Sequence, residues 1–352
     1  MCDNKLISHY HGFLTFWAMV KVGDSLFFSD WLENGLYEYN LKSKRTVFLK
    51  EFEEEQVPNI HNMALIDDEY IWFIPSTNGT KIAIYNIINK QIEYINVGSD
   101  FDKYEKNTFE YGFVKDRHIW LFPKKGTKFI SIDMQSRNVH EYEIPYELNN
   151  NITYEVGFFE NVICIKERIY IRHTFCNSLM EFVDGKFDTN FELLFDKTEH
   201  NICFAKYNSL LLVFSRKQRR LILFNPFENR IVKERKINIP ENIEMCGCVV
   251  IRNDRLFIFP FYKENIYVIN LLTDELEIVS VSKIIHDNLG QQDYRYMTII
   301  DCKKSIYIAT DVKDFPMLEL NEDNSIVSTR FCRNTESEIY ELINRISEEN
   351  KC

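Results

Sequence analysis

The sequence has few residues that break regular structure and no long apolar run. Its 352 residues include only 11 glycines and 8 prolines, without a low-complexity tract, which argues against a disordered or fibrous chain. It contains no apolar stretch of about 18 residues, so we expect no transmembrane helix. The first residues lack the basic and apolar regions of a signal peptide. Nine cysteines without framework spacing then predict a cytoplasmic protein with reduced thiols.

Surplus positive charge and catalytic motifs are also missing. The chain carries 42 Lys and Arg against 53 Asp and Glu, a formal charge of −11, whereas a nucleic-acid-binding protein needs a basic face. Glycine-rich phosphate loops, a Gly-x-Ser-x-Gly elbow, His-Glu-x-x-His and paired Cys-x-x-Cys motifs do not occur. His9 and His11 would share one face of an extended segment, but no third ligand follows at a useful spacing. We therefore expect no metal, no cofactor, and neither a nucleic acid nor a membrane as partner.

One short apolar run recurs seven times along the chain. Successive copies lie 45, 48, 50, 42, 45 and 50 residues apart, and a second run begins 10 or 11 residues after each first one. The constant offset indicates two strands joined by a connection of nearly constant length, as in a hairpin. The first runs are Leu26–Phe28, Ile71–Phe73, Ile119–Leu121, Ile169–Ile171, Leu211–Val213, Leu256–Ile258 and Ile306–Ile308.

Two further segments complete each copy, one before the first run and one after the second. The later segment is rich in β-branched and aromatic residues, as in Ile92–Val97 and Leu276–Val281. Four strands per unit of about 46 residues match the length of a β-propeller blade. A sheet with two apolar faces must cover both, and packing against neighbouring copies does so. We therefore predict an all-β, seven-bladed β-propeller of four-stranded antiparallel blades.

The predicted propeller spans residues 1–333 and is followed by a short α-helix over residues 334–352. In this helix Thr335 and Glu338 match a capping box. We interpret it as docked on the last blade, with a partner-binding helix as the alternative. Residues 5–13 could add a strand to the last blade. The blades are expected at approximately 14–55, 60–100, 108–146, 154–195, 200–240, 244–282 and 294–333.

Asn or Asp usually closes the second run of each copy. These residues tolerate a left-handed backbone and bond to the amides that follow them, so we expect a turn at each. The positions are Asn40, Asn86, Asp133, Asn225, Asn270 and Asn321.

Cys203 and Cys248 occupy equivalent positions in neighbouring copies. Buried cysteine usually behaves as a small hydrophobic residue, so we interpret both as core residues. Redox or metal chemistry is the alternative.

Candidate catalytic residues lie at the start of the expected innermost strands. His61 begins one such strand and Tyr296 matches it, while Glu110 and Glu160 fall at the adjacent register of their own strands. Imidazole and carboxylates converging on the mouth of a central channel could act as acid and base. The alternative is that this edge of a propeller is simply polar.

Candidate ligand-binding residues lie mainly in the loops after the first runs. Aromatic and arginine side chains are favoured anchors of interfaces, although packing between blades would also explain them. Asn62 and Tyr296, at the starts of inner strands, complete the set. The loop residues are Trp31, Arg219, Arg220, Phe261 and Tyr262.

The second and third copies resemble known propeller blades. Ile71–Pro75 with Ile82–Asn86, and Ile119–Pro123 with Ile132–Asp133, are similar to blades of kelch-type and streptogramin-lyase-type propellers. This resemblance covers nearly the whole chain as a pattern. The kelch double glycine and the Gly-His and Trp-Asp marks of WD40 repeats are missing, and no residue matches a lyase catalytic position, so none is carried over.

These observations favour a cytoplasmic, bacterial binding module that recognises a protein or another ligand through one loop face. The alternative is an enzyme of lyase or hydrolase type with its site at the channel mouth. A third hypothesis is a structural subunit, whose oligomer would depend on residues 339–346.

Overall fold

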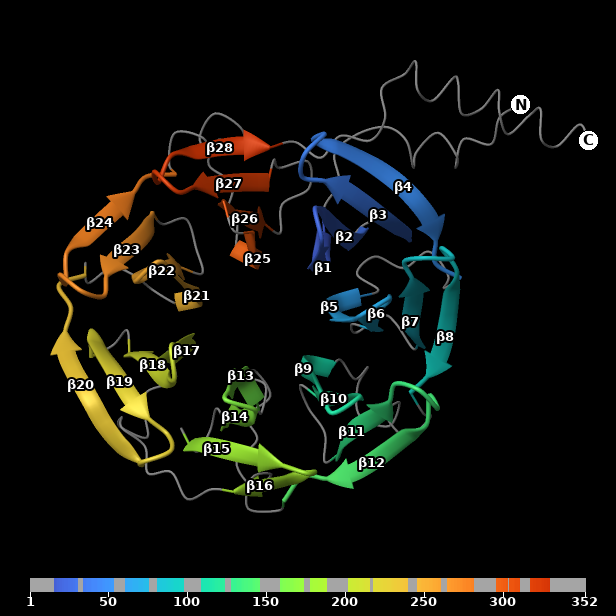
Figure 1. The fold of residues 1–352 in the computed structure, drawn as a ribbon, viewed down its shortest axis with the longest axis horizontal. Coiled ribbons are helices and arrows are strands. Elements are labelled where there is room, and N and C mark those ends of the chain that lie inside the picture. The colour runs from blue at the N-terminus through green and yellow to red at the C-terminus, as the bar shows by residue number, and fades with distance from the viewer. Residues whose placement is uncertain are drawn as a thin grey trace, which may run out of the picture. The chain divides into compact units, whose positions relative to one another are not determined.

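A computed structural model describes most of the strands and the short turns of the chain. It describes residues 16–30, 34–53, 61–75, 81–97, 109–123, 128–145, 159–173, 178–188, 202–215, 218–239, 246–260, 265–281, 296–302, 304–310 and 317–329. They form seven four-stranded antiparallel sheets, each built from four consecutive strands (Figure 1). The predicted all-β, seven-bladed propeller is confirmed. The expected helix over residues 334–352 and the possible closing strand at residues 5–13 lie outside these ranges.

The chain divides into two compact units. The first comprises Met1–Val97 and Met297–Cys352 and contains blades 1, 2 and 7. Blade 1 consists of β1 (Phe16–Val22), β2 (Ser25–Asp30), β3 (Gly35–Asn40) and β4 (Arg45–Glu51). Blade 2 consists of β5 (His61–Asp67), β6 (Tyr70–Pro75), β7 (Lys81–Asn86) and β8 (Ile92–Asn96). Blade 7 consists of β25 (Tyr296–Cys302), β26 (Ser305–Thr310), β27 (Met317–Asn321) and β28 (Ile326–Thr329).

The second unit, Gly98–Tyr296, contains blades 3 to 6. Blade 3 consists of β9 (Phe109–Lys115), β10 (His118–Pro123), β11 (Lys128–Asp133) and β12 (Val139–Glu143). Blade 4 consists of β13 (Phe159–Ile165), β14 (Arg168–His173), β15 (Ser178–Val183) and β16 (Lys186–Asp188). Blade 5 consists of β17 (Ile202–Tyr207), β18 (Leu210–Ser215), β19 (Arg220–Asn225) and β20 (Arg230–Lys236). Blade 6 consists of β21 (Cys246–Arg252), β22 (Arg255–Pro260), β23 (Ile266–Asn270) and β24 (Leu276–Val279).

In the first unit, blade 1 is covered on both faces by neighbouring blades. Strand β1 contacts β5 of blade 2 and β26 of blade 7. The consecutive residues Phe27 and Phe28 point to opposite faces, because side chains alternate along a strand. Phe27 packs in a cluster with Phe73 of blade 2, whereas Phe28 packs in a cluster with Tyr307 of blade 7. This explains why β2 is buried along its whole length and shows no alternation of apolar and polar residues.

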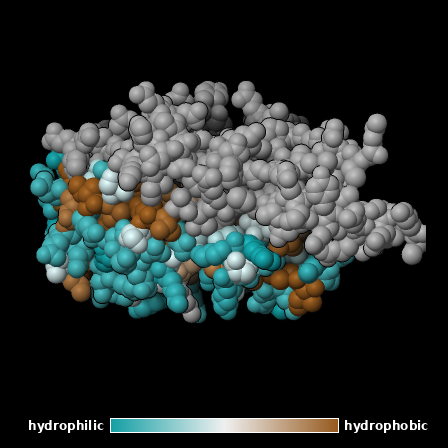
Figure 2. All heavy atoms as spheres, turned by 90° about the horizontal axis from the view of Figure 1, so that it is seen from above, coloured by the Kyte–Doolittle hydropathy of each residue, from teal (hydrophilic) through white to brown (hydrophobic). Residues whose placement is uncertain are grey.

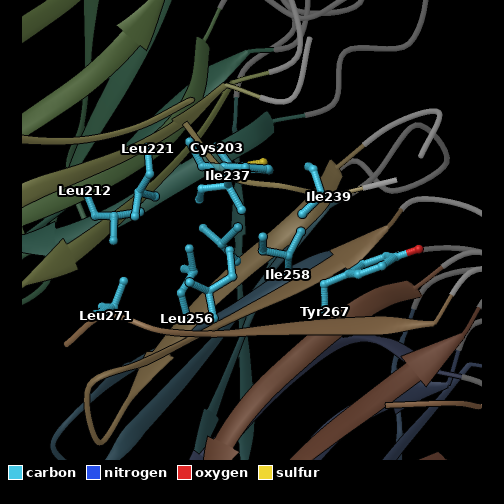
Figure 3. Close-up of a cluster of buried hydrophobic side chains, with 12 residues drawn as sticks. Cys203, Leu212, Leu221, Ile237, Ile239, Leu256, Ile258, Tyr267 and Leu271 are labelled. Carbon is cyan, nitrogen blue, oxygen red and sulfur yellow. The ribbon is translucent and has the colours of Figure 1, made fainter. Parts of the chain in front are cut away.

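The second unit repeats this packing from blade to blade. In blade 5, Leu211 and Val213 face a cluster shared with blade 4, whereas Leu212 and Phe214 face a cluster shared with blade 6. Figure 3 shows Leu212 and Leu221 of blade 5 lying near Leu256 of blade 6. Blade 5 therefore contributes side chains to two separate cores.

The turns between the third and fourth strands follow the expected Asx pattern in five blades. Asn40 Oδ1 accepts hydrogen bonds from the amides of Lys42 and Ser43, at 3.1 and 2.9 Å. Asn86, Asp133, Asn225 and Asn270 do the same. A left-handed backbone was expected at the Asn or Asp itself, but it is not found there. It occurs four residues later, as at Lys44 with φ 57°, because that residue closes the turn with its amide on the carbonyl of Asn40.

The described surface is mainly hydrophilic. Figure 2 shows hydrophilic side chains interspersed with smaller hydrophobic patches. The exposed apolar side chains include Val47 on β4, Ile278 on β24 and Val327 on β28. No helix within the described ranges is long and apolar enough to cross a membrane.

Phe129 tests the packing between blades 3 and 4. It is fully buried and packs against Phe182 and Phe187 of blade 4, with ring centroids 5.8 and 5.5 Å away. Because truncating a buried aromatic leaves a cavity, Phe129→Ala should lower the free energy of unfolding by about 3–5 kcal/mol. The half-exposed Val47→Ala should change it by less than about 0.5 kcal/mol. Urea denaturation would measure both, and equal losses would contradict the described core.

Cys203 and Cys248 test the assignment of these cysteines to the core. Figure 3 shows Cys203 among the apolar side chains between blades 5 and 6. Burial, with a smaller effect of Cys203, raises the pKa of the Cys248 thiol to about 12. Because the thiolate is the reactive form, Cys248 should resist alkylation in the native protein. Cys203 should resist it because the side chain is buried, whereas the exposed Cys164 should react. Peptide mapping by mass spectrometry would contradict this if all three reacted at one rate.

Candidate functional site

His61 begins β5 as expected, but its side chain is buried. Only 3% of the residue is exposed, and its ring packs against Phe52 and Phe73, with centroids 4.5 and 5.6 Å away. Its Nδ1 is 3.0 Å from Ser29 Oγ, within hydrogen-bond distance. Burial lowers the pKa of His61 to about 3, so the imidazole is neutral at neutral pH. The side chain therefore does not point to a solvent-filled mouth, because aromatic packing between blades 1 and 2 encloses it.

Asn62 and Glu110 occupy equivalent β-bulges. In β5, His61 pairs with Pro75 and Met63 with Ile74, which leaves Asn62 as the extra residue. In β9, Phe109 pairs with Pro123 and Tyr111 with Phe122, which leaves Glu110 in that position. Bulges redirect side chains and often occur beside functional sites. Asn62 is half-buried, and the side chain of Glu110 lies outside the description.

The remaining inner-strand candidates are placed by their backbone only. Glu160 lies in β13 opposite Arg172, and Tyr296 begins β25. Strands β9 and β13 pack against each other, which brings the backbones of Glu110 and Glu160 onto neighbouring strands. The convergence of these carboxylates with His61 or Tyr296 stays a prediction.

Two of the five loop candidates are described. Arg219 adopts a left-handed backbone with φ 51°, and its carbonyl accepts a hydrogen bond from the amide of Ile237. Arg220 begins β19, and its guanidinium pairs with the carboxylate of Glu234. Arg220 is therefore held against its own blade. Trp31, Phe261 and Tyr262 lie outside the described residues.

A polar cavity that the sequence reasoning missed lies where blade 7 meets blade 1. Figure 1 shows the β25–β28 sheet beside the β1–β4 sheet. The cavity has a volume of about 400 Å³ and is formed by the short turns at the ends of the strands. These turns lie at the opposite end of each strand from the loops predicted to bind ligands. The lining residues are Lys21, Asp24, Leu41, Lys42, Lys44, Cys302, Lys304, Ser305, Tyr307 and Glu319.

Glu319 lines this cavity, and its carboxylate accepts hydrogen bonds from both blades. Ser305 Oγ and Tyr307 Oη each donate a hydrogen bond of 2.8 Å to Glu319 Oε1. Lys44 Nζ from blade 1 lies 3.2 Å from Glu319 Oε2 and donates a 2.8 Å hydrogen bond to Tyr307 Oη. This network crosses from blade 1 to blade 7 and ties the two blades together through side chains.

The network keeps Glu319 ionised although little of it is exposed. Only 12% of its side chain is accessible, and burial alone would favour the protonated form. Hydrogen bonds from Ser305 and Tyr307 and the charge of Lys44 outweigh burial, so the pKa of Glu319 is lowered. Burial, followed by the hydrogen bond to Glu319, raises the pKa of Tyr307. Tyr307 therefore remains a neutral donor at neutral pH.

The other lysines are available to a ligand. Lys42 Nζ lies 2.5 Å from Asp24 Oδ2, but both side chains are more than half exposed, so this ion pair is weak. Lys21 and Lys304 form no ion pair or hydrogen bond through their side chains with any described residue. Among the described lining residues, four ammonium groups thus face two carboxylates, a surplus of two positive charges in a chain of formal charge −11.

The equivalent junction between blades 1 and 2 serves as an internal comparison. In blade 1, Ser25 and Glu38 take the places that Ser305 and Glu319 have in blade 7, and Ser25 Oγ donates a 2.6 Å hydrogen bond to Glu38. By strand register, Ile66 stands at the position of Lys21, Ile88 at that of Lys42 and Asp24 at that of Lys304. The junction of blades 1 and 2 therefore packs without the lysines at these three positions, so the fold does not require them there.

No described group of histidine, cysteine, aspartate or glutamate side chains could hold a metal ion. The cavity is instead suited to an anion, because lysine ammonium groups outnumber carboxylates among its described lining residues.

Comparison with known proteins supports the fold. No family model and no curated protein matches the sequence. Virginiamycin B lyase from Staphylococcus aureus has a similar structure, with a TM-score of 0.61 and 12% identity over 86% of this chain and 92% of that one. A streptogramin B lyase structure gives a TM-score of 0.60 and 14% identity, over 86% and 94% of the two chains.

The extracellular domain of a one-component system from B. thetaiotaomicron is also similar. Its TM-score is 0.58 at 14% identity, over 86% of this chain and 40% of that one. At such identities the likeness shows the fold alone. The resemblance to streptogramin-lyase-type propellers is thereby confirmed, whereas the kelch-type resemblance stays a prediction.

The burial of His61 predicts a specific pH dependence of stability. The pKa of His61 lies near 3 in the folded state and near 6.5 in the unfolded chain. Between these values the unfolded chain binds a proton that the native state does not. The free energy of unfolding should therefore fall as the pH is lowered, by at most about 1.4 kcal/mol per pH unit.

Urea denaturation of the wild type and of His61→Gln at several pH values between 7 and 4 would measure this term. The variant should be less stable at neutral pH but lose less stability on acidification. Identical pH dependence of the two proteins would show that His61 is not buried in its neutral form.

Proposed function

We propose that this protein is a binding module that takes a small anionic ligand at the junction of blades 7 and 1. The supporting observation is the cluster of Lys21, Lys42, Lys44 and Lys304 around one cavity. Electrostatic attraction between a cationic cavity and an anion is stronger when the groups are partly withdrawn from water. The surplus of two charges favours a dianion, such as a phosphate monoester or a dicarboxylate.

The size and lining of the cavity favour a small organic anion over a bare ion. A volume of about 400 Å³ lies within the range of ligand pockets. Leu41 and Cys302 add apolar contact area beside the lysines. Lys44 Nζ lies over the phenol ring of Tyr307, 5.4 Å from its centroid. A ligand would therefore place its anionic group among the lysines and a short carbon body against the apolar wall.

The enzyme hypothesis has less support among the described residues. The imidazole of His61 is enclosed by Phe52, Phe73 and Ser29, which leaves it poorly placed to exchange protons with a substrate. The lyase activity named for two of the similar structures belongs to those proteins. We retain a site at the channel mouth around Glu110 and Glu160 as a separate proposal.

Several earlier expectations also remain proposals. Recognition of a protein partner through the loops that contain Trp31, Arg219, Arg220, Phe261 and Tyr262 is compatible with a ligand cavity at the other end of the strands. A cytoplasmic location is supported by the nine cysteines of the sequence, which lack the spacing of a disulfide framework. The acidic net charge supports the absence of a nucleic-acid partner.

Calorimetric titration with simple anions tests the proposed ligand class. The probes are inorganic phosphate, glycerol 3-phosphate and succinate, with glycerol as the uncharged reference. Lys21→Met and Lys304→Met should each weaken the binding of the preferred anion by about 10-fold or more, because hydrogen bonds to charged groups contribute about 1.5–3 kcal/mol.

Lys90→Met provides the matched control. Lys90 stands at the position of Lys44 in blade 2, with the same left-handed backbone, but lies outside the cavity. Its substitution should leave binding unchanged. Failure of every anion to bind, or an equal loss in Lys90→Met, would contradict the proposal.

A further inference from the structure

Blades 7 and 1 are joined by side chains in the described part of the chain. Each of the two sheets consists only of its own four consecutive strands, so no described strand is shared between them. Strand β1 contacts β26, and a cluster that includes Phe28, Tyr39 and Met317 fills the space between the sheets. The network of Lys44, Tyr307 and Glu319 lies beside this cluster.

The cavity takes its lysines from both sides of this junction. Lys21, Lys42 and Lys44 belong to blade 1, whereas Lys304 belongs to blade 7. Lys44 is engaged by Glu319 of the opposite blade. Lys21 and Lys304 have no such counter-charge among the described residues, and like charges brought into one cavity repel each other. Lys44 and Glu319 therefore attract each other across the junction, whereas Lys21 and Lys304 repel each other across it.

We propose that an anion bound in this cavity acts as a clasp that holds blade 1 against blade 7. This inference rests on the proposed function, because it concerns the same ligand. The anion would lie between Lys21 and Lys42 of blade 1 and Lys304 of blade 7. Its negative charge would attract the lysines of both blades, which otherwise repel one another. Ligand binding and the closure of the junction are then one coupled equilibrium.

The coupling follows from where the ligand contacts lie. When the two blades separate, the lysines of blade 1 and Lys304 of blade 7 part, and neither side keeps the full site. A ligand that binds one state only lowers the population of the other by a factor of 1 + [L]/Kd. At a ligand concentration of 100 Kd, opening of the junction should therefore become about 100-fold rarer.

Hydrogen exchange of the full chain, with and without inorganic phosphate or glycerol 3-phosphate, tests the clasp. Sodium chloride at equal ionic strength serves as the reference for screening. Amides of β1–β4 and of β25–β28 that exchange through opening of the junction should slow together, by up to about 100-fold at 100 Kd. Strands β17–β20, which belong to the other unit, should change much less.

Two variants separate the clasp from general stabilisation. Lys304→Met removes the cation contributed by blade 7 and should abolish the anion-dependent slowing in both blades. Lys90→Met, outside the cavity, should retain it. Calorimetry of the same samples reports whether the anion binds.

The two proposals fail differently in this experiment. If calorimetry detects binding but exchange slows in blade 1 alone, or equally throughout the chain, the clasp is wrong and the proposed ligand site stands. If no anion binds to the wild type, the proposed function is wrong and the clasp is excluded with it.

Discussion

A four-stranded sheet with apolar side chains on both faces cannot be buried by its own short segment of chain. Phe27 and Phe28 are neighbours in β2, yet one packs toward blade 2 and the other toward blade 7. Leu211 and Leu212 divide in the same way between blades 4 and 6. Burial of apolar area contributes about 25 cal/mol per Å², and for each of these sheets that contribution depends on the neighbouring blades. Strands β2 and β18 are therefore buried over nearly their whole length.

The junction between the first and last blades follows the same rule but adds polar contacts. Its apolar cluster resembles those of the other junctions, whereas Lys44, Tyr307 and Glu319 cross it with hydrogen bonds. The adjacent cavity holds three further lysines, at positions that the junction of blades 1 and 2 fills with Ile66, Ile88 and Asp24. Because the fold does not demand these lysines, a ligand is the simplest explanation for them.

Much of the fold was predictable from local patterns. The recurring runs located the second and third strands of each blade, because buried strands need continuous apolar segments and their connections have similar lengths. Asn40 and its equivalents marked the turns through a local hydrogen bond. The burial of Cys203 followed from the usual behaviour of cysteine as a small hydrophobic residue. The left-handed residue, Lys44, was missed because its conformation depends on how the four-residue turn closes.

The site was less accessible to sequence reasoning. His61 lies at the predicted strand start, but its environment depends on Phe52 and Ser29 of the preceding blade, which register alone does not reveal. Lys21 and Lys304 are nearly 300 residues apart in sequence and meet only because the last blade packs on the first. An alignment of the repeats would have shown lysine at turn positions where other blades carry Ile88, Phe227 or Leu272.

Removing one blade tests most directly whether the stability of a sheet depends on its neighbouring blade. In a chain that ends at residue 295, blade 1 loses the cover of its Phe28 and Tyr39 face. Hydrogen exchange of the amides in β1–β4 should then be strongly accelerated, although every residue of those strands is still present. Unchanged protection of β1–β4 in the shortened chain would contradict the claim that these sheets are stable only through mutual burial of their apolar faces.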